Sequence, residues 1–368
     1  MMAKNLLKGA LLASAGLLVI GGAARADDMQ AAKDYIAKVT SPVTAWEGPT
    51  TGPKAAGKKL IVVVSTDQRN GGARGVSEGV EEAAKVLGWD VRVIDGQGSV
   101  SARAAGISQA IALKADGLVL DAIDGAEQAA AVEDAAKAGI KIVGWHSNAK
   151  PGPDAKLHLF TNLTTDPLEV AKAAATYAVV ASEGKAGVVV FTDSAYAIAI
   201  AKSDAMAAVI KACKTCTLLS VEDTPLADAA NRMPQLTTSL LQRYGAKWTY
   251  GLSINDLTFD FMAPALQSAG IAGGAAPHSI SAGDGSEPAF QRIKAGEYQV
   301  GTVAEPLRLH GWQEVDELNR AFAGQPASGF VAPPHLFIKA NVDKDGGPKN
   351  IYDPQNGYPE VYKKIWGK

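Results

Sequence analysis

The chain has little of what marks catalytic, nucleic-acid-binding or membrane-embedded proteins. Its 368 residues include only two cysteines, and aromatic residues make up 6%. Lysine and arginine number 36 against 38 aspartates and glutamates, so the basic excess typical of a nucleic-acid-binding face is missing. No apolar run beyond the N-terminus is long enough to span a membrane. These absences leave a globular chain that is long enough for two domains and is not embedded in a membrane.

Recognisable catalytic and metal-binding motifs are also missing. There is no G-x-S-x-G nucleophile elbow, and the five histidines lack a catalytic or metal-ligand spacing. Asn341–Gly346 resembles the start of a calcium loop, but Tyr352 stands where the closing glutamate would be, so we interpret it as a solvated turn. We therefore expect no enzymatic activity, no metal and no cofactor.

The first 26 residues have the organisation of an export signal. Lys4 and Lys8 precede an apolar core at Ala10–Ile20, and Ala24-Arg25-Ala26 forms a small-x-small cleavage site. A membrane anchor is the alternative, but the run is short for a span. We expect cleavage after Ala26 and a soluble protein in a bacterial periplasm.

The two cysteines, Cys213 and Cys216, form a C-x-x-C motif with three possible roles. A redox motif is expected at the start of a helix, whereas this pair falls between a predicted helix and a predicted strand. Zinc would need two further ligands, which the sequence does not offer. A structural disulfide is the interpretation we favour, because the expected compartment is oxidising.

From residue 58 onward, strand and helix patterns alternate, which predicts βαβ units and parallel sheets. The run Leu60–Val64 is apolar throughout, as in a strand buried on both faces. The expected strands are Leu60–Ser65, Asp90–Ile94, Gly117–Leu120, Ile140–Trp145, Leu157–Thr161, Gly187–Phe191, Thr217–Val221, Lys247–Ser253, Ser279–Ala282, Gln299–Val303 and Leu336–Ile338. The expected helices are Ala73–Leu87, Ser101–Ala115, Ala126–Ala138, Asp166–Ser182, Ala197–Ala212, Ala229–Tyr244, Leu257–Ala269, Pro288–Ala295 and Pro306–Phe322. The fold class is therefore α/β, with two doubly wound lobes that separate near residues 161–165.

The chain ends are less regular than this alternating part. Residues 27–57 are polar and interrupted by proline and glycine, so we expect an extension on the surface with a short helical piece at Asp34–Lys38. The tail 341–368 is rich in glycine, proline and asparagine, and we expect it to be irregular apart from a last helical turn at Pro359–Trp366.

Polar residues follow the predicted strands, where open α/β sheets bind ligands. Such residues also serve as turn formers and helix caps, but seven clusters from two lobes favour a shared cleft. A dinucleotide-binding site is the alternative interpretation of the first loop. However, Gly71, Gly72 and Gly75 do not form G-x-G-x-x-G, and the loop is too long for the tight turn that places a pyrophosphate at the start of a helix. The clusters are Asp67–Asn70, Asp121 with Asp124, Trp145–Ser147, Thr192–Ser194, Ser253–Asp256, Gly283–Gly285 and Ala304–Pro306.

Taken in order, these elements resemble the type I periplasmic sugar-binding proteins, the ribose-binding-like family. The resemblance covers about residues 58–340 and is carried by LIVVVST at 60–66, GLVLDAID at 117–124, His146-Ser147, Ser253–Asp256, Ala282–Gly285 and TVAEPLRLHGWQEVDEL at 302–318. It implies two lobes joined by three crossing strands. The N-lobe would comprise 58–162 and 306–328, and the C-lobe 163–305 and 329–340.

The resemblance also implies where a sugar would bind. Asn255 and Asp284 match positions that hydrogen-bond the sugar, and Glu305 stands where an amide is common. His146-Ser147 replaces an acidic-basic pair, and the first loop lacks the family's stacking aromatics, so Trp145 is either the stacking ring or a core residue. The expected ligand-binding residues are Asp67, Arg69, Asn70, Asp121, Trp145, His146, Ser147, Asn255, Asp284 and Glu305.

The function implied by the resemblance is capture of a sugar or polyol and its delivery to the permease of an ABC importer, by a monomer. Carboxylates and amides at the strand ends suit such a ligand, because they pair with hydroxyl groups through short hydrogen bonds. Two alternatives stay open: a ligand sensor for chemotaxis or signalling without transport, and a binder of a small cationic solute.

Overall fold

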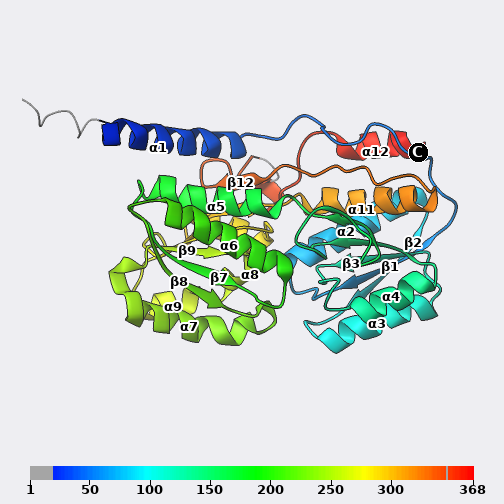
Figure 1. Ribbon diagram of the computed structural model, residues 1–368, viewed down its shortest axis with the longest axis horizontal. Helices are drawn as coiled ribbons and strands as arrows, with labels where there is room; N and C mark the ends of the chain where they lie inside the picture. Colours follow the sequence, from blue (N-terminus) through cyan, green and yellow to red (C-terminus); the bar gives the residue numbers. More distant parts are fainter. Residues whose placement is uncertain (1–19, 345–346) are drawn as a thin grey trace, which may run out of the picture.

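The computed structural model describes residues 20–344 and 347–368 and consists of two α/β lobes side by side (Figure 1). The expected signal peptide lies outside the described residues, apart from the backbone of 20–26 at the start of helix α1. Each lobe is built on a six-stranded sheet, and the strand orders are β2-β1-β3-β4-β6-β5 and β8-β7-β9-β10-β11-β12. All strand pairs are parallel except β5 with β6 and β11 with β12. The predicted doubly wound α/β architecture is confirmed.

The N-lobe contains the first sheet and five helices. Its strands are β1 (Leu60–Ser65), β2 (Asp90–Asp95), β3 (Gly117–Asp121), β4 (Lys141–Trp145), β5 (Gly152–Asp154) and β6 (Leu159–Leu163). Its helices are α2 (Gly71–Leu87), α3 (Val100–Ala112), α4 (Ala129–Lys137), α11 (Leu307–Phe322) and α12 (Tyr358–Trp366).

The C-lobe contains the second sheet, and helix α1 packs against it. Its strands are β7 (Gly187–Thr192), β8 (Thr217–Asp223), β9 (Tyr250–Ser253), β10 (His278–Ser281), β11 (Gln299–Ala304) and β12 (His335–Ile338). Its helices are α1 (Ile20–Val39), α5 (Pro167–Ala181), α6 (Ala197–Ala212), α7 (Ala229–Tyr244), α8 (Leu257–Asp260), α9 (Ala263–Ser268) and α10 (Glu287–Ala295), and short 3-10 turns are η1 (Leu226–Asp228), η2 (Gly245–Lys247) and, in the tail, η3 (Gly347–Lys349). None of the described helices combines the length and apolar character needed to cross a bilayer.

Strand β1 shows why an unbroken apolar run marks a central strand. Ile61 and Val63 pack under α2 and α11, whereas Val62 and Val64 face α3 and α4, and all four are fully buried. Because successive strand residues point to opposite faces, a strand covered on both sides must be apolar at every position. The sheet is therefore the middle layer of three, and its loops are free to carry polar residues.

Three elements depart from the expected pattern. Helix α1 spans Ile20–Val39 and is much longer than the helical piece expected at Asp34–Lys38. The single helix expected over Leu257–Ala269 is divided into α8 and α9, with Pro264 in the first turn of α9, where its missing N–H costs least. Strand β5 is additional and pairs antiparallel with β6.

The N-terminal and C-terminal segments connect the lobes on the side of α5 and α11 (Figure 1). Helix α1 lies along α5, where the Tyr35 hydroxyl donates to Glu169 at 3.1 Å. The chain then reaches the N-lobe, where the Asn319 side chain in α11 donates to the carbonyl of Pro53 at 3.0 Å. The tail runs from β12 to α12, and Trp366 there stacks on Trp312 of α11. The N-terminal and C-terminal segments thus add two connections to the three chain segments that join the lobes after β6, β11 and α11.

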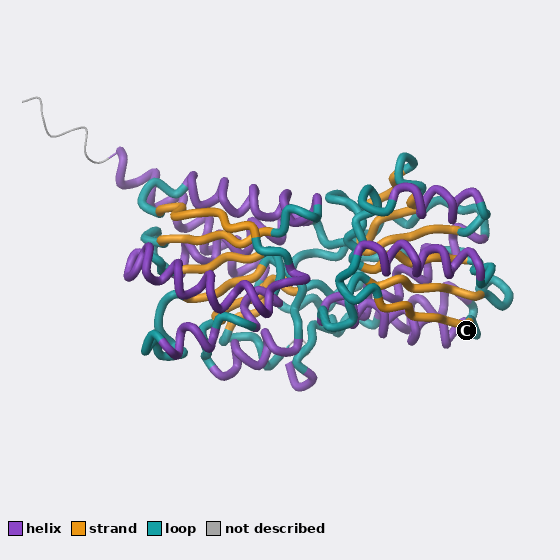
Figure 2. Tube along the Cα trace, turned by 90° about the horizontal axis from the view of Figure 1, so that it is seen from below, coloured by secondary structure: helices purple, strands orange, loops and turns teal. Residues whose placement is uncertain are grey.

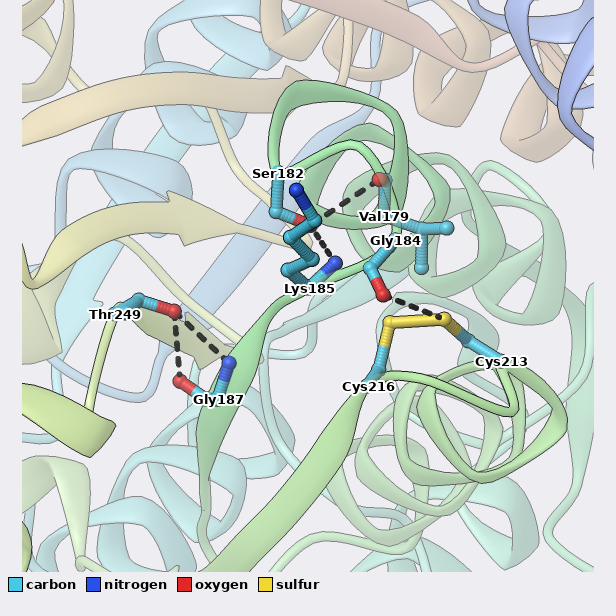
Figure 3. Close-up of a disulfide and its surroundings, with 8 residues drawn as sticks. All are labelled: Val179, Ser182, Gly184, Lys185, Gly187, Cys213, Cys216 and Thr249. Carbon is cyan, nitrogen blue, oxygen red and sulfur yellow. Dashed lines mark hydrogen bonds between the residues drawn. A yellow bond between two sulfur atoms is a disulfide. The ribbon is translucent and has the colours of Figure 1, made fainter.

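Cys213 and Cys216 form the expected disulfide, with their Cα atoms 5.3 Å apart. The bond joins the end of α6 to the residue before β8, and the carbonyl of Gly184 lies 3.7 Å from the Cys213 sulfur (Figure 3). It lies at the end of the C-lobe remote from the other lobe. Its position supports a structural role.

Replacing both cysteines by serine should lower the free energy of unfolding by about 2 kcal/mol, because the loop that the bond closes is very short. Urea unfolding of the double variant measures this loss, and reduced wild-type protein serves as the matched control. Thiol titration of unfolded, unreduced protein should find no free cysteine. Two free thiols would contradict the disulfide.

Because several carboxyl groups are buried, we expect the free energy of unfolding to fall as the pH rises from mildly acidic to mildly basic values. Burial raises the pKa of Asp121 to about 8, of Glu317 to about 7 and of Asp284 to about 6, and it raises the pKa of Glu314 well above its usual value. These four carboxyl groups therefore bind more protons in the folded protein than in the unfolded chain between about pH 4 and pH 8. Burial lowers the pKa of His310 to about 4, which acts in the opposite direction below about pH 6.5, but the carboxyl groups outnumber it, so the free energy of unfolding falls as the pH rises through this window.

Thermal unfolding at pH 5.5 and pH 8 tests this decline. Glu314→Gln should weaken it, because both carboxylate oxygens of Glu314 are buried without a hydrogen-bond partner among the described residues. Glu133→Gln, on the exposed face of α4, is the control and should leave the slope unchanged. A melting temperature that rises between pH 5.5 and pH 8 would refute the prediction.

Candidate functional site

A cavity of about 680 Å³, part of it open to solvent, lies between the lobes at the carboxyl ends of their strands. Figure 2 shows the loops of the two lobes meeting in this region. The cavity is lined by Thr66, Asp67, Asn70, Gly98, Ala122, Trp145, His146, Tyr196, Ile198, Ala199, Lys202, Leu226, Ala227, Ile254, Asn255, Leu257 and Asp284.

Six of the ten ligand-binding residues expected from the sequence line this cavity, namely Asp67, Asn70, Trp145, His146, Asn255 and Asp284. The other four do not. Arg69 points outward, with 74% of its side chain exposed, and pairs with Asp67. Asp121 accepts from Ser77 behind the cavity, and the Ser147 hydroxyl donates to the carbonyl of Leu120. Glu305 lies beneath the cavity wall, in contact with residues that line it.

Asp284 and Asn255 form the acidic end of the cavity. The Asn255 amide donates to one oxygen of Asp284, and its own oxygen accepts from the N–H of Leu257. Asp284 is 3% exposed, and burial raises its pKa to about 6 against the opposing attraction of Lys202 and His146. One carboxylate oxygen is therefore oriented by the protein, and the group can accept a hydrogen bond from a ligand.

Gly72 at the start of α2 permits the close approach of the two lobes. A Cβ atom at this position would collide with the Asp284 carboxylate of the other lobe. The Asn70 side chain caps the helix by accepting from the N–H of Gly72 at 2.9 Å. The two glycines of this loop, Gly71 and Gly72, therefore leave room for the other lobe to approach the start of α2.

Glu305 is the charged centre beneath the cavity. Its carboxylate lies 3.0 Å from His146 Nε2, 3.5 Å from Lys202 Nζ and 3.7 Å from His310 Nδ1, and it accepts from the N–H of Thr165 at 3.1 Å. Burial alone would raise the pKa of Glu305, but His146 and Lys202 hold it well below its usual range. The carboxylate is therefore ionised and balances the buried Lys202.

Lys202 is the most informative residue that sequence reasoning missed. It lines the cavity from α6 although it is only 2% exposed. The signal was its helical spacing: Ile198, Lys202 and Met206 are four residues apart, and all three are buried. A lysine on the buried face of a helix requires a partner or a function.

The aromatic rings do not sandwich the cavity. Trp145 is fully buried, and His146 stacks on it with ring centroids 3.8 Å apart. The Trp145 indole N–H donates to His310 at 3.1 Å, which fixes the ring within the N-lobe. Trp145 is thus a core residue that reaches the cavity wall, and the imidazole of His146 covers part of it.

The lobes contact each other across the cavity mouth, so this conformation is closed. The hydroxyls of Thr66 and Tyr196 lie 3.2 Å apart, and the N–H of Ala197 donates to Asp124 at 3.1 Å. Arg103, buried and paired with Glu127, also donates to the Thr66 hydroxyl at 3.3 Å. Closure of this kind excludes water from the ligand and leaves the buried polar groups to pair with it.

One group among the described residues has the donor atoms of a metal site. The ligand atoms of His146, Asp284 and Glu305 lie within 4.8 Å of one another. However, His146 donates to Glu305, and the Lys202 ammonium already lies 3.5 Å from the same carboxylate. A cation would compete with this lysine, so we assign no metal to the group.

Two doubly wound lobes that meet around a shared cavity at the carboxyl ends of their strands define a type I periplasmic binding protein fold. The profile of the periplasmic binding protein domain matches residues 61–326, and the chain belongs to this family. No protein of curated function matches the chain significantly.

Solved structures of the same fold include three with a bound sugar or polyol. A solute-binding protein of an Agrobacterium vitis ABC transporter with allitol is 20% identical, with 78% of this chain and 97% of that chain covered and a TM-score of 0.65. A second A. vitis protein, with α-D-tagatopyranose, is 16% identical (80% and 99% covered, TM-score 0.70). The arabinose-binding component from Shewanella sp. ANA-3, with L-arabinofuranose, is 16% identical (83% and 98% covered, TM-score 0.68).

Proposed function

We propose that the protein is a periplasmic solute-binding protein that captures a neutral sugar or polyol between its lobes and delivers it to an ABC permease. The observation that carries this proposal is the cavity between the lobes, which is lined by hydrogen-bonding groups of Asn255, Asp284, His146 and Lys202. The ligands named for structures of the same fold support it. The role is binding rather than catalysis.

The Lys202 ammonium at the cavity wall, rather than the net charge of the cavity, favours a neutral ligand over the cationic solute that the sequence left open, because the Asp284 carboxylate lines the cavity as well. Lys202 lines the cavity and is balanced by Glu305 beneath it. A cationic ligand would have to approach this buried ammonium group, and like charges in a low-dielectric site repel strongly. Hydroxyl groups can both accept from Lys202 and donate to Asp284.

A thermal-shift screen over pentoses, hexoses, polyols and amines tests the proposal. A ligand present at 100 times its Kd stabilises the folded state by about 2.7 kcal/mol, which is readily detected as a raised melting temperature. We expect at least one neutral sugar or polyol to raise it. Stabilisation by amines alone would favour the cationic alternative, and no stabilisation by any solute would overturn the proposal.

Transport and periplasmic location need separate tests. Deletion of the gene should reduce uptake of the ligand found in the screen; unchanged uptake with altered chemotaxis would favour the sensor alternative. The mature N-terminus of protein from a periplasmic extract should begin at Asp27, as the export signal predicts. Retention of residues 1–26 in that fraction would contradict cleavage.

A further inference from the structure

Helix α6 of the C-lobe carries residues of the cavity wall, and the residue before it does not cap its first turn. Ile198, Ala199 and Lys202 line the cavity from this helix. Tyr196, which precedes it, has an extended backbone and makes no side-chain capping bond. The first N–H groups of a helix have no partner within it, and the helix dipole makes this end attractive to a carboxylate. The start of α6 is therefore suited to an acceptor from another part of the chain.

Asp124 of the N-lobe is that acceptor. Its oxygen Oδ2 accepts from the N–H of Ala197, the first residue of α6, at 3.1 Å. Its other oxygen, Oδ1, accepts from the N–H of Ala126 at 2.9 Å and from that of Glu127 at 3.3 Å, in the turn that follows Asp124. One carboxylate thus caps a turn in its own lobe and a helix in the other lobe. We call the bond from Ala197 to Asp124 the interlobe cap.

The loop that carries Asp124 is fixed to the end of β4 in the N-lobe. The N–H of Ala122 donates to the carbonyl of Trp145 at 2.9 Å. The N–H of Gly125 donates to the carbonyl of Ser147, also at 2.9 Å. Because these bonds lie on both sides of Asp124, its carboxylate is held in place by the N-lobe itself.

The loop before α6 is fixed in the same way within the C-lobe. The Asp193 side chain, which is 2% exposed, accepts from the N–H of Ala195 at 3.0 Å and from that of Leu226 at 2.8 Å. The Asp193 carbonyl accepts from the N–H of Tyr196 at 3.2 Å. Since both loops are fixed within their lobes, separation of the lobes must break the interlobe cap.

Asp124 can affect binding only through the contact between the lobes. It is 8% exposed and is not one of the residues that line the cavity. A hydrogen bond to a buried carboxylate is roughly twice as strong as one between neutral groups. The second contact at this place, between the hydroxyls of Thr66 and Tyr196 at 3.2 Å, joins two neutral groups. The interlobe cap is therefore the stronger of these two bonds.

Building on the proposed function, we propose that Asp124 is a positioning residue that stabilises the closed state and slows release of the bound solute by capping α6 across the lobe boundary. The alternative is that Asp124 serves only as the cap of its own turn. Closure follows the encounter of a solute with the open lobes, so a weaker interlobe cap should raise the dissociation rate constant and leave the association rate constant almost unchanged.

Asp124→Asn separates the two roles of this side chain. The amide oxygen of asparagine can still accept from Ala126 and Glu127, and asparagine caps helices about as well as aspartate. The amide nitrogen then takes the place of Oδ2 and turns a donor toward the N–H of Ala197. The local turn is therefore kept while the interlobe cap is lost.

Asp154→Asn is the matched control. Oδ1 of Asp154 accepts from the N–H of Lys156 at 2.9 Å and from that of Leu157 at 3.2 Å, the same spacing as at Asp124. Its Oδ2 accepts from the Asn148 side chain at 2.6 Å. All these partners lie in the N-lobe, so this variant loses a similar bond without changing a contact between the lobes.

Disulfide cross-linking of the full mature protein, without any added sugar, measures how often the lobes close. A Cβ atom at Gly98 would lie 3.3 Å from the Cβ of Ala227 in the other lobe, so cysteines at these two positions can bond only when the lobes are together. The backbone at Gly98 is left-handed, with a φ of 72°, and strains a cysteine there equally in every background.

We expect Asp124→Asn to slow cross-linking by about tenfold, which is the loss of one hydrogen bond to a charged group. Asp154→Asn should slow it by less than about twofold, because its local turn is kept. The melting temperatures of the two variants should agree within about 2 °C, which excludes a general loss of folding. An unchanged cross-linking rate in Asp124→Asn would overturn the proposal, and so would equal slowing in both variants.

Release of a bound solute is the second measurement. The probe is the sugar or polyol that raises the melting temperature most in the thermal-shift screen. In stopped-flow experiments, Asp124→Asn should raise its dissociation rate constant by about tenfold and change its association rate constant by less than about twofold. Slower cross-linking with unchanged dissociation would overturn the role in solute release. If no sugar or polyol bound, the proposed function would fail, whereas cross-linking would still decide whether Asp124 stabilises closure.

Discussion

Replacing Asp284 by alanine should weaken ligand binding by about 2–5 kcal/mol, which corresponds to about 30-fold or more in Kd. The carboxylate is 3% exposed, lines the cavity and has one oxygen held by the Asn255 amide. Its loss removes a ligand acceptor and also leaves that amide without its partner in a closed site. Calorimetry with the ligand found in the screen measures the change, and ligand-induced thermal stabilisation should vanish with it.

Two further variants test whether the loss of ligand affinity arises from a change in the cavity. Asp284→Asn keeps the shape but exchanges part of the acceptor for a donor, so its affinity should be reduced without a collapse of the fold. Arg69→Ala removes a side chain that is 74% exposed and does not line the cavity, so Kd should change by less than about twofold. An unchanged Kd in Asp284→Ala would show that the ligand binds elsewhere.

Strong local patterns explain why most of the fold could be predicted. The bounds of β1 and α6 agree with the expected ranges, because a strand buried on both faces and a long apolar helix leave clear sequence signals. Strand β5, Gly152–Asp154, could not be foreseen, since glycine, proline and aspartate all disfavour strands. It exists only because β6 offers an edge for antiparallel pairing, and such tertiary information is not local.

The site was only partly predictable for a related reason. Polar residues after strands mark the edge where open α/β sheets bind ligands, and this logic led to His146, Asn255 and Asp284, which line the cavity. It could not tell which of them face the cavity: Asp121 follows β3 directly but turns toward Ser77. It also overlooked Lys202, because this lysine lies within helix α6 and does not follow a strand.

Glu305→Ala should lower the free energy of unfolding by about 3–5 kcal/mol at pH 7, because it leaves a buried lysine without its counter-charge. Lys202 is 2% exposed, and Glu305 is the carboxylate beside it at 3.5 Å. The pKa of Glu305 is depressed, so its stabilising effect is present above the pKa of the unfolded chain, about 4.5, and is lost as the pH falls. Urea unfolding at pH 7 and pH 4 should therefore show a smaller difference between variant and wild type at the lower pH.

A double variant distinguishes the charge imbalance from a simple packing defect. Lys202→Met in the Glu305→Gln background removes both charges while retaining similar volumes, and an apolar replacement of a buried ion pair is often neutral or stabilising. The double variant should therefore be more stable than Glu305→Gln alone, and a double-mutant cycle gives the coupling energy. Glu133→Ala, which breaks an exposed pair on α4, should cost no more than about 0.5 kcal/mol. If Lys202→Met failed to restore stability, the carboxylate would act mainly through His146 and Thr165, and the balance of charge beneath the cavity would have to be assigned to those contacts instead.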